Sequence, residues 1–205
     1  VHAFIMIPSG HNGPDKQLVA KLDGNGSTYV TNTSHYLMNA EYDSVTNRLR
    51  AVQLVNSVSD KIKVYFIPSY LNGNDGVFNM TYYDLLSGLD LTIFPSYYEP
   101  WGYTPMESVA FGVPTITTDL SGFGQWVLSK CGDGFEQSGV KVIHRTDSNY
   151  SSVVDQISTN LASYLGEDQR AKKTAQNNAK KTAKKATWNS FIKHYEKAYK
   201  SVLKK

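Results

Sequence analysis

The stretch FPSYYEPWGYTPMES, residues 94–108, joins a predicted strand to a predicted helix and decides how the chain is expected to fold. Leu91–Phe94 is an apolar run of strand length. GYTPME predicts a helix start with Thr104 as N-cap, Pro105 at the first helical position and Glu107 at the third, a T-x-x-E capping box. In α/β folds, ligands bind outside the carboxyl ends of the strands. We therefore expect this loop to lie at the functional edge of a sheet.

The same alternation of short apolar runs and helical segments extends along the chain. It predicts an α/β fold with a doubly wound, Rossmann-like parallel sheet. Strands are predicted at His2–Ile7, Ile62–Ile67, Leu91–Phe94, Pro114–Thr118 and Val140–His144. Helices are predicted at Glu41–Val55, Thr81–Leu86, Thr104–Phe111, Gly124–Ser129, Ser152–Leu165, Asp168–Lys185 and Trp188–Leu203.

We expect residues 1–185 to form one domain and residues 186–205 to form a C-terminal helix that packs across it. Apolar and aromatic residues in that helix repeat at helical spacing, which favours core positions for Trp188, Phe191, Ile192, Tyr195, Tyr199 and Val202. Residues 9–33 are turn-rich and predict an insertion or lid, with a small hairpin around residues 23–28. Because the chain opens directly in a strand and does not begin with Met, we expect an upstream part.

The composition is typical of a soluble globular protein, with 40% hydrophobic and 19% charged residues. Its apolar runs are strand-sized, far short of the roughly 20 residues that a membrane helix needs. The single cysteine, Cys131, excludes an internal disulfide and fits a reducing cytoplasm. Residues 172–205 hold eleven lysines against one acid, but few arginines and no interleaved stacking aromatics. We interpret them as a solvated helix face, not a nucleic-acid or membrane surface.

No metal site is predicted. The histidines lack the spacing of metal ligands and are interpreted as scattered structural or surface residues: His2, His11, His35, His144 and His194. No Asp-x-Asp motif is present either. We expect no metal and no cofactor.

The predicted helix start suits an anion, because free backbone N–H groups and the positive end of the helix dipole together hold phosphate. Gly102 lets the backbone approach a ligand closely. Glu99, just outside the helix, could hydrogen-bond sugar hydroxyls or stabilise developing positive charge, which suits transfer from a sugar nucleotide. Two plainer interpretations stay open at this point: Glu99 as an exposed loop carboxylate and Glu107 as part of the cap alone.

Residues 94–124, FPSYYEPWGYTPMESVAFGVPTITTDLSGFG, strongly resemble the glycogen synthase family of the animal and fungal type. Glu99 and Glu107 also resemble the glutamate-x7-glutamate motif of retaining nucleotide-sugar glycosyltransferases with the two-Rossmann (GT-B) fold. Weaker similarity covers most of the remaining chain except residues 9–33. The resemblance implies the nucleotide-sugar-binding, C-terminal half of a GT-B glycosyltransferase.

Residue by residue, the resemblance implies a donor site. Glu99 matches the glutamate at the reacting centre, and Glu107 matches the second glutamate, near the donor ribose. Further matches are the turn whose backbone meets the sugar and the helix start that contacts phosphate, namely Trp101, Gly102, Tyr103 and Thr104.

Two further groups complete the implied site. Tyr70 and Tyr82 align with aromatics that flank the nucleotide base. Ser121, Gly122 and Gly124 either line the site or cap the following helix.

The implied activity is transfer of glucose from UDP-glucose or ADP-glucose to the non-reducing end of an α-1,4-glucan. The alternatives are a GT-B transferase with another acceptor and a non-catalytic nucleotide-sugar-binding fragment. The family's donor-phosphate arginine and lysine, its N-terminal Rossmann domain and its arginine-rich sugar-phosphate helix have no match in this chain. We therefore expect the chain alone to be inactive, and we leave a homo-oligomeric full-length protein open.

Overall fold

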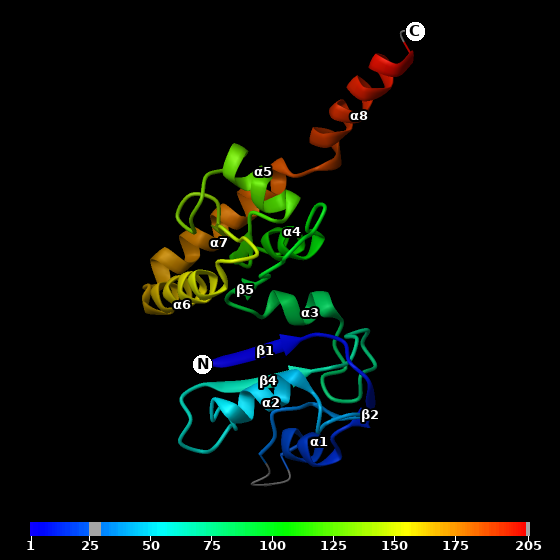
Figure 1. The fold of residues 1–205 in the computed structure, drawn as a ribbon, viewed down its shortest axis with the longest axis vertical. Coiled ribbons are helices and arrows are strands. Elements are labelled where there is room, and N and C mark those ends of the chain that lie inside the picture. Colours follow the sequence, from blue (N-terminus) through cyan, green and yellow to red (C-terminus); the bar gives the residue numbers. More distant parts are fainter. Residues whose placement is uncertain (25–29, 204–205) are drawn as a thin grey trace. The chain divides into compact units, whose positions relative to one another are not determined.

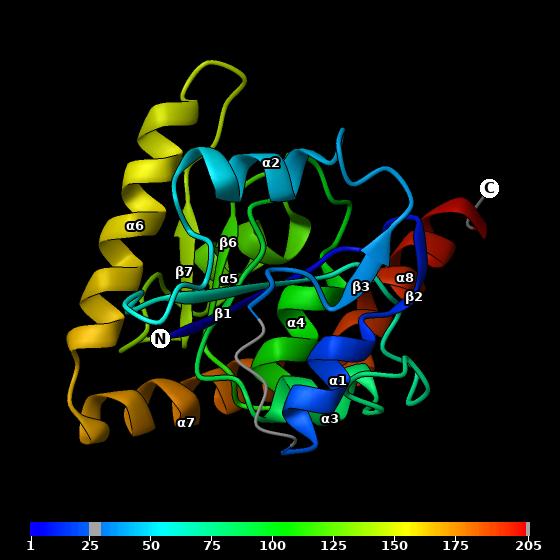
Figure 2. The ribbon, with the colours of Figure 1, turned by 90° about the horizontal axis from the view of Figure 1, so that it is seen from below.

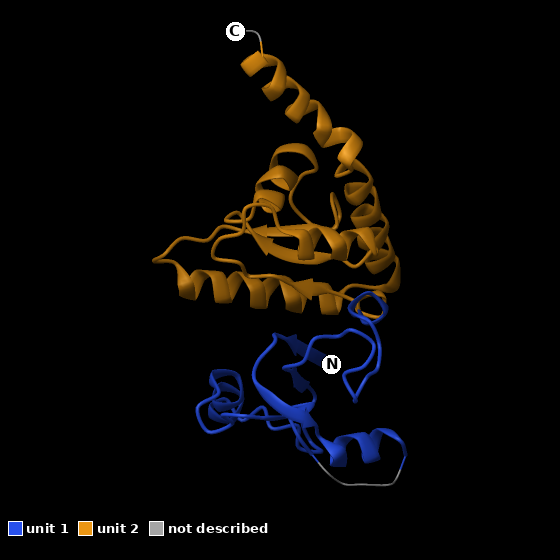
Figure 3. Cartoon of the chain, turned by 90° about the vertical axis from the view of Figure 1, so that its right-hand side faces the viewer, with its two compact units in different colours: residues 1–85 blue, residues 86–205 orange. Residues whose placement is uncertain are grey.

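The structure is a computed structural model that describes residues 1–24 and 30–203. The chain forms two compact units, residues 1–85 and 86–205 (Figures 1 and 3). Parallel strands occur in both units, and helices accompany them. The predicted α/β class is therefore confirmed, and the sheets are described unit by unit.

The first unit contains one parallel and one antiparallel strand pair. β1 (His2–Met6) and β4 (Lys63–Ile67) run parallel, and β2 (His11–Pro14) pairs antiparallel with β3 (His35–Leu37). The helices are α1 (Lys16–Leu22), α2 (Ser44–Ala51) and α3 (Tyr82–Ser87), the last of which crosses the boundary between the units.

The turn-rich segment 9–33 contains regular structure, since it includes β2 and α1. Asp15 caps α1 by accepting hydrogen bonds from the N–H groups of Gln17 and Leu18, as short acidic side chains do at helix starts. The hairpin predicted around residues 23–28 falls mostly on residues 25–29, outside the described part of the chain. The role of the segment as an insertion or lid stays a prediction.

The second unit is built around a three-stranded parallel sheet in the order β5 (Thr92–Ile93), β6 (Thr115–Thr118), β7 (Val140–Ile143). Each of these strands lies within its predicted range. Five helices accompany the sheet: α4 (Tyr103–Ala110), α5 (Gly122–Lys130), α6 (Tyr150–Gly166), α7 (Gln169–Lys185) and α8 (Trp188–Leu203).

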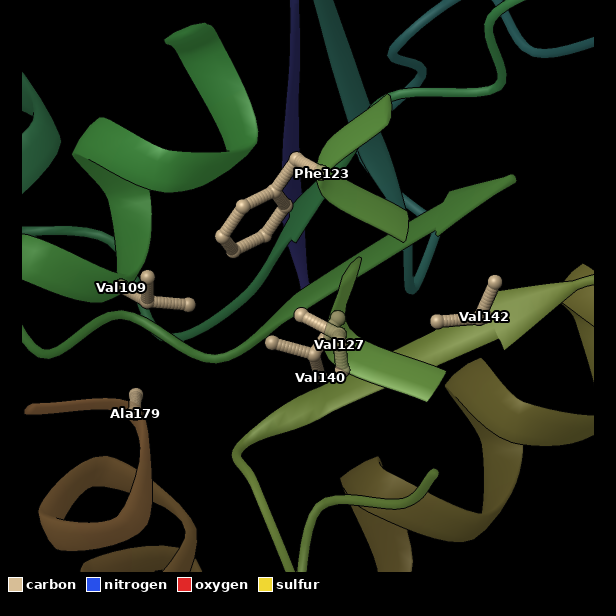
Figure 4. Close-up of a cluster of buried hydrophobic side chains, with 6 residues drawn as sticks. All are labelled: Val109, Phe123, Val127, Val140, Val142 and Ala179. Carbon is tan, nitrogen blue, oxygen red and sulfur yellow. The ribbon is translucent and has the colours of Figure 1, made fainter. Parts of the chain in front are cut away.

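Helices cover both faces of this sheet. Alternate residues of a strand point to opposite faces, and in β7 residues on each face are apolar and pack against helices. Val140 and Val142 of β7 join a buried cluster with residues of α4, α5 and α7, completed by Val109, Phe123, Val127 and Ala179 (Figure 4). Ile143 of β7 points to the opposite face, where it packs with Ile116 of β6 and with Val153 of α6. Helix α6 lies along β7 (Figure 2). The carboxyl ends of the strands are thereby held on a rigid base.

The prediction that the aromatics of α8 are core residues is wrong for most of them. No residue of α8 is buried, and Trp188 and Tyr199 are 61% and 62% exposed. Near its start, α8 contacts the body of the second unit through Phe191, whose ring lies 5.0 Å from that of Trp101. The helical spacing correctly predicted an apolar stripe, but a stripe does not specify what covers it.

Candidate functional site

The loops that leave β5 and β6 lie side by side at the carboxyl edge of the sheet. The N–H of Glu99 donates to the carbonyl of Leu120 at 3.1 Å, and the N–H of Gly122 donates to the carbonyl of Glu99 at 3.1 Å. Glu99 and Ser121 form a parallel bridge. The predicted residues around Glu99 and around Ser121 are therefore brought together, as expected from the carboxyl ends of neighbouring parallel strands.

The carboxylate of Glu99 is half-buried and oriented by neighbouring hydroxyl groups. Ser96 Oγ donates to Glu99 Oε2 at 3.1 Å, and Thr118 Oγ1 donates to the carbonyl of Ser96 at 2.7 Å. A Cβ added at Gly102 would lie 3.5 Å from Glu99 Oε2. The carboxylate thus lies beside the start of α4, and the plain alternative of an unoriented surface glutamate does not describe it.

The start of α4 differs from the prediction. Thr104 is not the N-cap: the cap residue is Gly102, with φ 106° and ψ 71°, and no side chain caps the helix. This left-handed conformation favours glycine, and it lets the chain enter the helix two residues earlier than a capping box would. Pro105 becomes the third helical residue, where its missing N–H still costs no helical bond. Glu107 is the fifth residue, so it does not complete a capping box with Thr104.

An uncapped start leaves main-chain donors available. Throughout the described ranges, no hydrogen bond is found for the backbone N–H groups of Gly102, Tyr103 and Thr104. Tyr103 and Thr104 are exposed. Such groups, with the positive end of the helix dipole, attract an anion.

The side chain of Trp101 packs inside the protein instead of facing a ligand. Its ring contacts those of Phe123 and Trp126, and its Nε1–H points to the sulfur of Met106 at 3.3 Å. The carbonyl of Trp101 accepts from the N–H of Phe123 at 2.5 Å. The part of this turn that the resemblance assigns to the sugar is its backbone, and that assignment stays a prediction.

Ser121 acts as a helix cap. It is fully buried, its Oγ accepts from the N–H of Gly124 at 3.0 Å, and it precedes the first residue of α5. Added Cβ atoms at Gly122 and Gly124 would collide with the carbonyl oxygens of Pro100 and Thr118. Capping of α5 by Ser121 is therefore confirmed, the glycines let the two loops approach each other, and lining of the site by this turn stays a prediction.

Tyr70 and Tyr82 belong to the first unit. The N–H of Tyr82 donates to the carbonyl of Leu71 at 2.9 Å, so the chain brings the two tyrosine segments together locally. Tyr70 is 75% exposed, and Tyr82 packs against Tyr83 with ring centroids 5.5 Å apart. Their role beside a nucleotide base stays a prediction.

A network around the buried Arg145, in contact with the loop that carries Glu99, was missed by sequence reasoning. Arg145, the second residue after β7, donates from Nη1 to the carbonyl of Pro95 at 2.5 Å and lies 3.5 Å from the ring centroid of Tyr97. Asp119, directly after β6, accepts from the N–H of Arg145 at 2.9 Å and contacts His144 Nδ1 at 2.5 Å. Their positions at the carboxyl ends of strands were the only signal that could have identified them.

One hollow of the second unit lies away from the predicted site. It measures about 510 Å³ and is lined by the turn before β7 and by α6 and α7, including Asp133, Phe135, Tyr164 and Arg170. None of the predicted site residues lines it. Among the described residues, no cluster of His, Cys, Asp and Glu suited to a metal ion is found, and no helix there is long and apolar enough to cross a membrane.

Comparisons with known proteins agree on one family. A family model described as glycogen synthase matches residues 21–205. Glycogen (starch) synthase isoform 1 of Saccharomyces cerevisiae is 32% identical over 166 residues, 80% of this chain and 23% of that protein. The glycogen (starch) synthase of Caenorhabditis elegans is 36% identical over 137 residues, 67% of this chain and 20% of that protein. The chain therefore spans less than a quarter of the length of these relatives.

Proposed function

The chain belongs to the glycogen synthase family, and we propose that the complete product of its gene is a retaining glucosyltransferase. The enzyme moves glucose from UDP-glucose or ADP-glucose to the non-reducing end of an α-1,4-glucan. The observation that carries this proposal is the oriented carboxylate of Glu99 beside the uncapped start of α4. The carboxylate suits the positive charge that develops on the sugar, and the helix start suits the departing diphosphate.

In this mechanism the start of α4 holds the donor's diphosphate. The N–H groups of Gly102, Tyr103 and Thr104 are the donors, and the helix dipole stabilises the negative charge that grows as the bond to the anomeric carbon breaks. No side chain of the helix competes for these groups, because Gly102 caps the helix without one.

Glu99 stabilises the positive charge that develops on the glucose ring. Ser96 donates to Oε2 and holds the carboxylate in place before the reaction, so little reorganisation is needed in the transition state. Glu107 is assigned to the donor ribose, and the backbone of Trp101 to the sugar.

The proposed fold context is the C-terminal half of a GT-B glycosyltransferase with Rossmann-like topology. The parallel sheet with helices on both faces supports this assignment for the second unit. One domain over residues 1–185, a partner N-terminal Rossmann domain, base stacking by Tyr70 and Tyr82, a homo-oligomeric state and a cytoplasmic location stay predictions.

The test measures incorporation of labelled glucose into glycogen by the complete gene product. Glu99→Gln keeps the size of the side chain and removes its charge, so kcat should fall by about 10²–10³-fold. Glu196→Gln on the exposed α8 is the matched control and should transfer glucose at the wild-type rate. Near-normal turnover of Glu99→Gln with intact folding would contradict the proposal.

The donor base is tested by thermal shift. A nucleotide that binds only the native protein raises its melting temperature, so UDP and ADP compared at equal concentrations identify the preferred base. If neither nucleotide raises the melting temperature, the proposal that this protein binds a nucleotide-sugar donor is wrong.

A further inference from the structure

Arg145 carries a buried positive charge for which the described residues offer no carboxylate partner. The side chain is 7% exposed, and its Nε is buried without a hydrogen-bond acceptor. The ion pairs found in the described part of the chain are Lys141–Asp133 and His144–Asp119. Burying a charge in this way is costly unless other contacts compensate for it. The contacts that Arg145 does make therefore indicate what it is for.

Those contacts are directed at one short segment of the loop after β5. Nη1 donates to the carbonyl of Pro95, and the guanidinium carbon lies 3.5 Å from the ring centroid of Tyr97. A guanidinium over an aromatic face at that distance is attracted to it electrostatically. One face of the Tyr97 ring is covered and held in place.

The rest of the Tyr97 ring is open. The residue is 53% exposed although one face is covered by Arg145. A ring that is already held from behind loses less conformational entropy when it binds a ligand than a freely rotating surface aromatic does. Tyr97 offers a flat apolar surface whose orientation is already set.

The position of this ring ties it to the proposed reaction. Tyr97 is two residues before Glu99. The main chain is held just before Tyr97, where the carbonyl of Ser96 accepts from Thr118, and again at Glu99, whose N–H donates to the carbonyl of Leu120. The ring of Tyr97 and the oriented carboxylate of Glu99 therefore belong to one loop whose main chain is held at both positions.

The chemistry of the ring suits a neutral sugar better than a phosphate. A glucose ring presents a face of C–H groups that packs against an aromatic face, whereas the diphosphate needs N–H donors and has them at the start of α4. We propose that Tyr97, held by Arg145, is the stacking surface for a glucosyl unit of the α-glucan acceptor. This inference rests on the proposed function and adds an acceptor contact to it.

The test uses steady-state kinetics of the complete gene product, with glycogen and the sugar nucleotide varied separately. Tyr97→Ala removes the surface and should raise the KM for glycogen by about ten-fold, while the KM for the donor changes less than about two-fold. Tyr97→Phe keeps the ring and should bind glycogen about five-fold more tightly than Tyr97→Ala. Tyr199→Ala, on α8 at 62% exposure, is the matched control.

Arg145 is tested as a positioning residue. Arg145→Lys keeps the charge but lacks the planar group that covers the ring, so the KM for glycogen should rise about three-fold. Since Arg145 is buried, its variant is compared at a temperature well below its own melting temperature. An Arg145→Lys enzyme that loses stability but keeps the wild-type KM for glycogen would show a purely structural role.

Direct binding separates this inference from the proposed function. Maltoheptaose is titrated without donor into wild type and Tyr97→Ala, and the heat of binding is measured. Weaker binding by Tyr97→Ala supports the stacking surface even if the wild type transfers no glucose, in which case the proposed function alone fails. Equal binding of maltoheptaose, or a rise in the KM for the donor in place of that for glycogen, would overturn the inference.

Discussion

Gly122 should be intolerant of alanine because the loop that carries Glu99 fills the space around it. An added Cβ would collide with the carbonyl oxygen of Pro100 and would lie 3.2 Å from Cα of Trp101. Both atoms belong to the main chain, so no flexible side chain can move aside. The N–H of Gly122 also donates to the carbonyl of Glu99, and displacement of the loop would weaken that bond.

The expected cost follows from these contacts. Overpacking a tight site costs about 1–3 kcal/mol, and a weakened hydrogen bond adds up to about 1 kcal/mol. The lower entropy of an unfolded chain with alanine returns about 0.4–1 kcal/mol. We expect Gly122→Ala to lower the free energy of unfolding by about 2 kcal/mol and the melting temperature by about 4–8 °C.

Gly166 supplies a matched control. It is the last residue of α6, and nothing lies within 4 Å of a Cβ added there. Neither glycine has a positive φ that would strain alanine. Gly166→Ala should therefore stabilise the protein by about 0.5–1 kcal/mol, so the two variants should shift in opposite directions.

The assay is thermal and denaturant unfolding of both variants, followed by glucose transfer in the complete gene product. Displacement of Glu99 by a fraction of an ångström should lower kcat for Gly122→Ala by at least about ten-fold. Equal melting temperatures for the two variants would refute the packing argument. A destabilised Gly122→Ala with full kcat would instead refute the link between this contact and Glu99.

Three further predictions concern other parts of the second unit. Burial, with a smaller effect of Asp90, raises the pKa of Tyr164 to about 12. Because the phenol titrates near 10 when unfolded, the free energy of unfolding should fall by roughly 3 kcal/mol as pH rises from about 10 to 12. Urea unfolding at pH 9 and 11 spans about half of this change, roughly 1.4 kcal/mol, which should be missing in Tyr164→Phe; an identical fall in both proteins would contradict the assignment. Asp119→Ala removes the acceptor for the N–H of Arg145 and should lower the free energy of unfolding by about 1–3 kcal/mol; an unchanged denaturation midpoint would refute this. Phe191→Ala removes the ring that holds α8 to two tryptophans, so amide exchange should speed up in α8 and stay slow in β6; unchanged exchange in α8 would count against that contact.

Much of the secondary structure could be predicted from local patterns. β6 and β7 lie inside their predicted ranges because short β-branched and apolar runs between turn residues have few alternatives. The helix predicted at Glu41–Val55 is observed only at Ser44–Ala51, where Asp43 caps its start. Helix ends depend on single caps, so sequence periodicity places the middle of a helix better than its ends.

The start of α4 could not be predicted from the capping motif, because it is set by the positive φ angle of Gly102. Thr104, Pro105 and Glu107 satisfy a capping box in sequence, but Gly102 takes a left-handed conformation and begins the helix earlier. Nothing in the local sequence distinguishes the two helix starts. The phosphate-binding hypothesis survives the change, because an uncapped start leaves more main-chain donors available than a capped one.

The Arg145–Tyr97 contact could not be predicted because it joins segments 48 residues apart through tertiary packing alone. By contrast, the motif that carries the family resemblance could be recognised in the sequence, because the close packing of two loops restricts which residues fit there. Gly122 and Gly124 are fixed by the approach of Pro100 and Thr118, and Ser121 by the cap of α5. These constraints act on the packing of the loops and on the position of Glu99 at once. Substitutions of Ser121, Gly122 and Gly124 should therefore affect stability and activity together, whereas a substitution of Tyr97, a half-exposed residue of the same motif, should affect the acceptor alone.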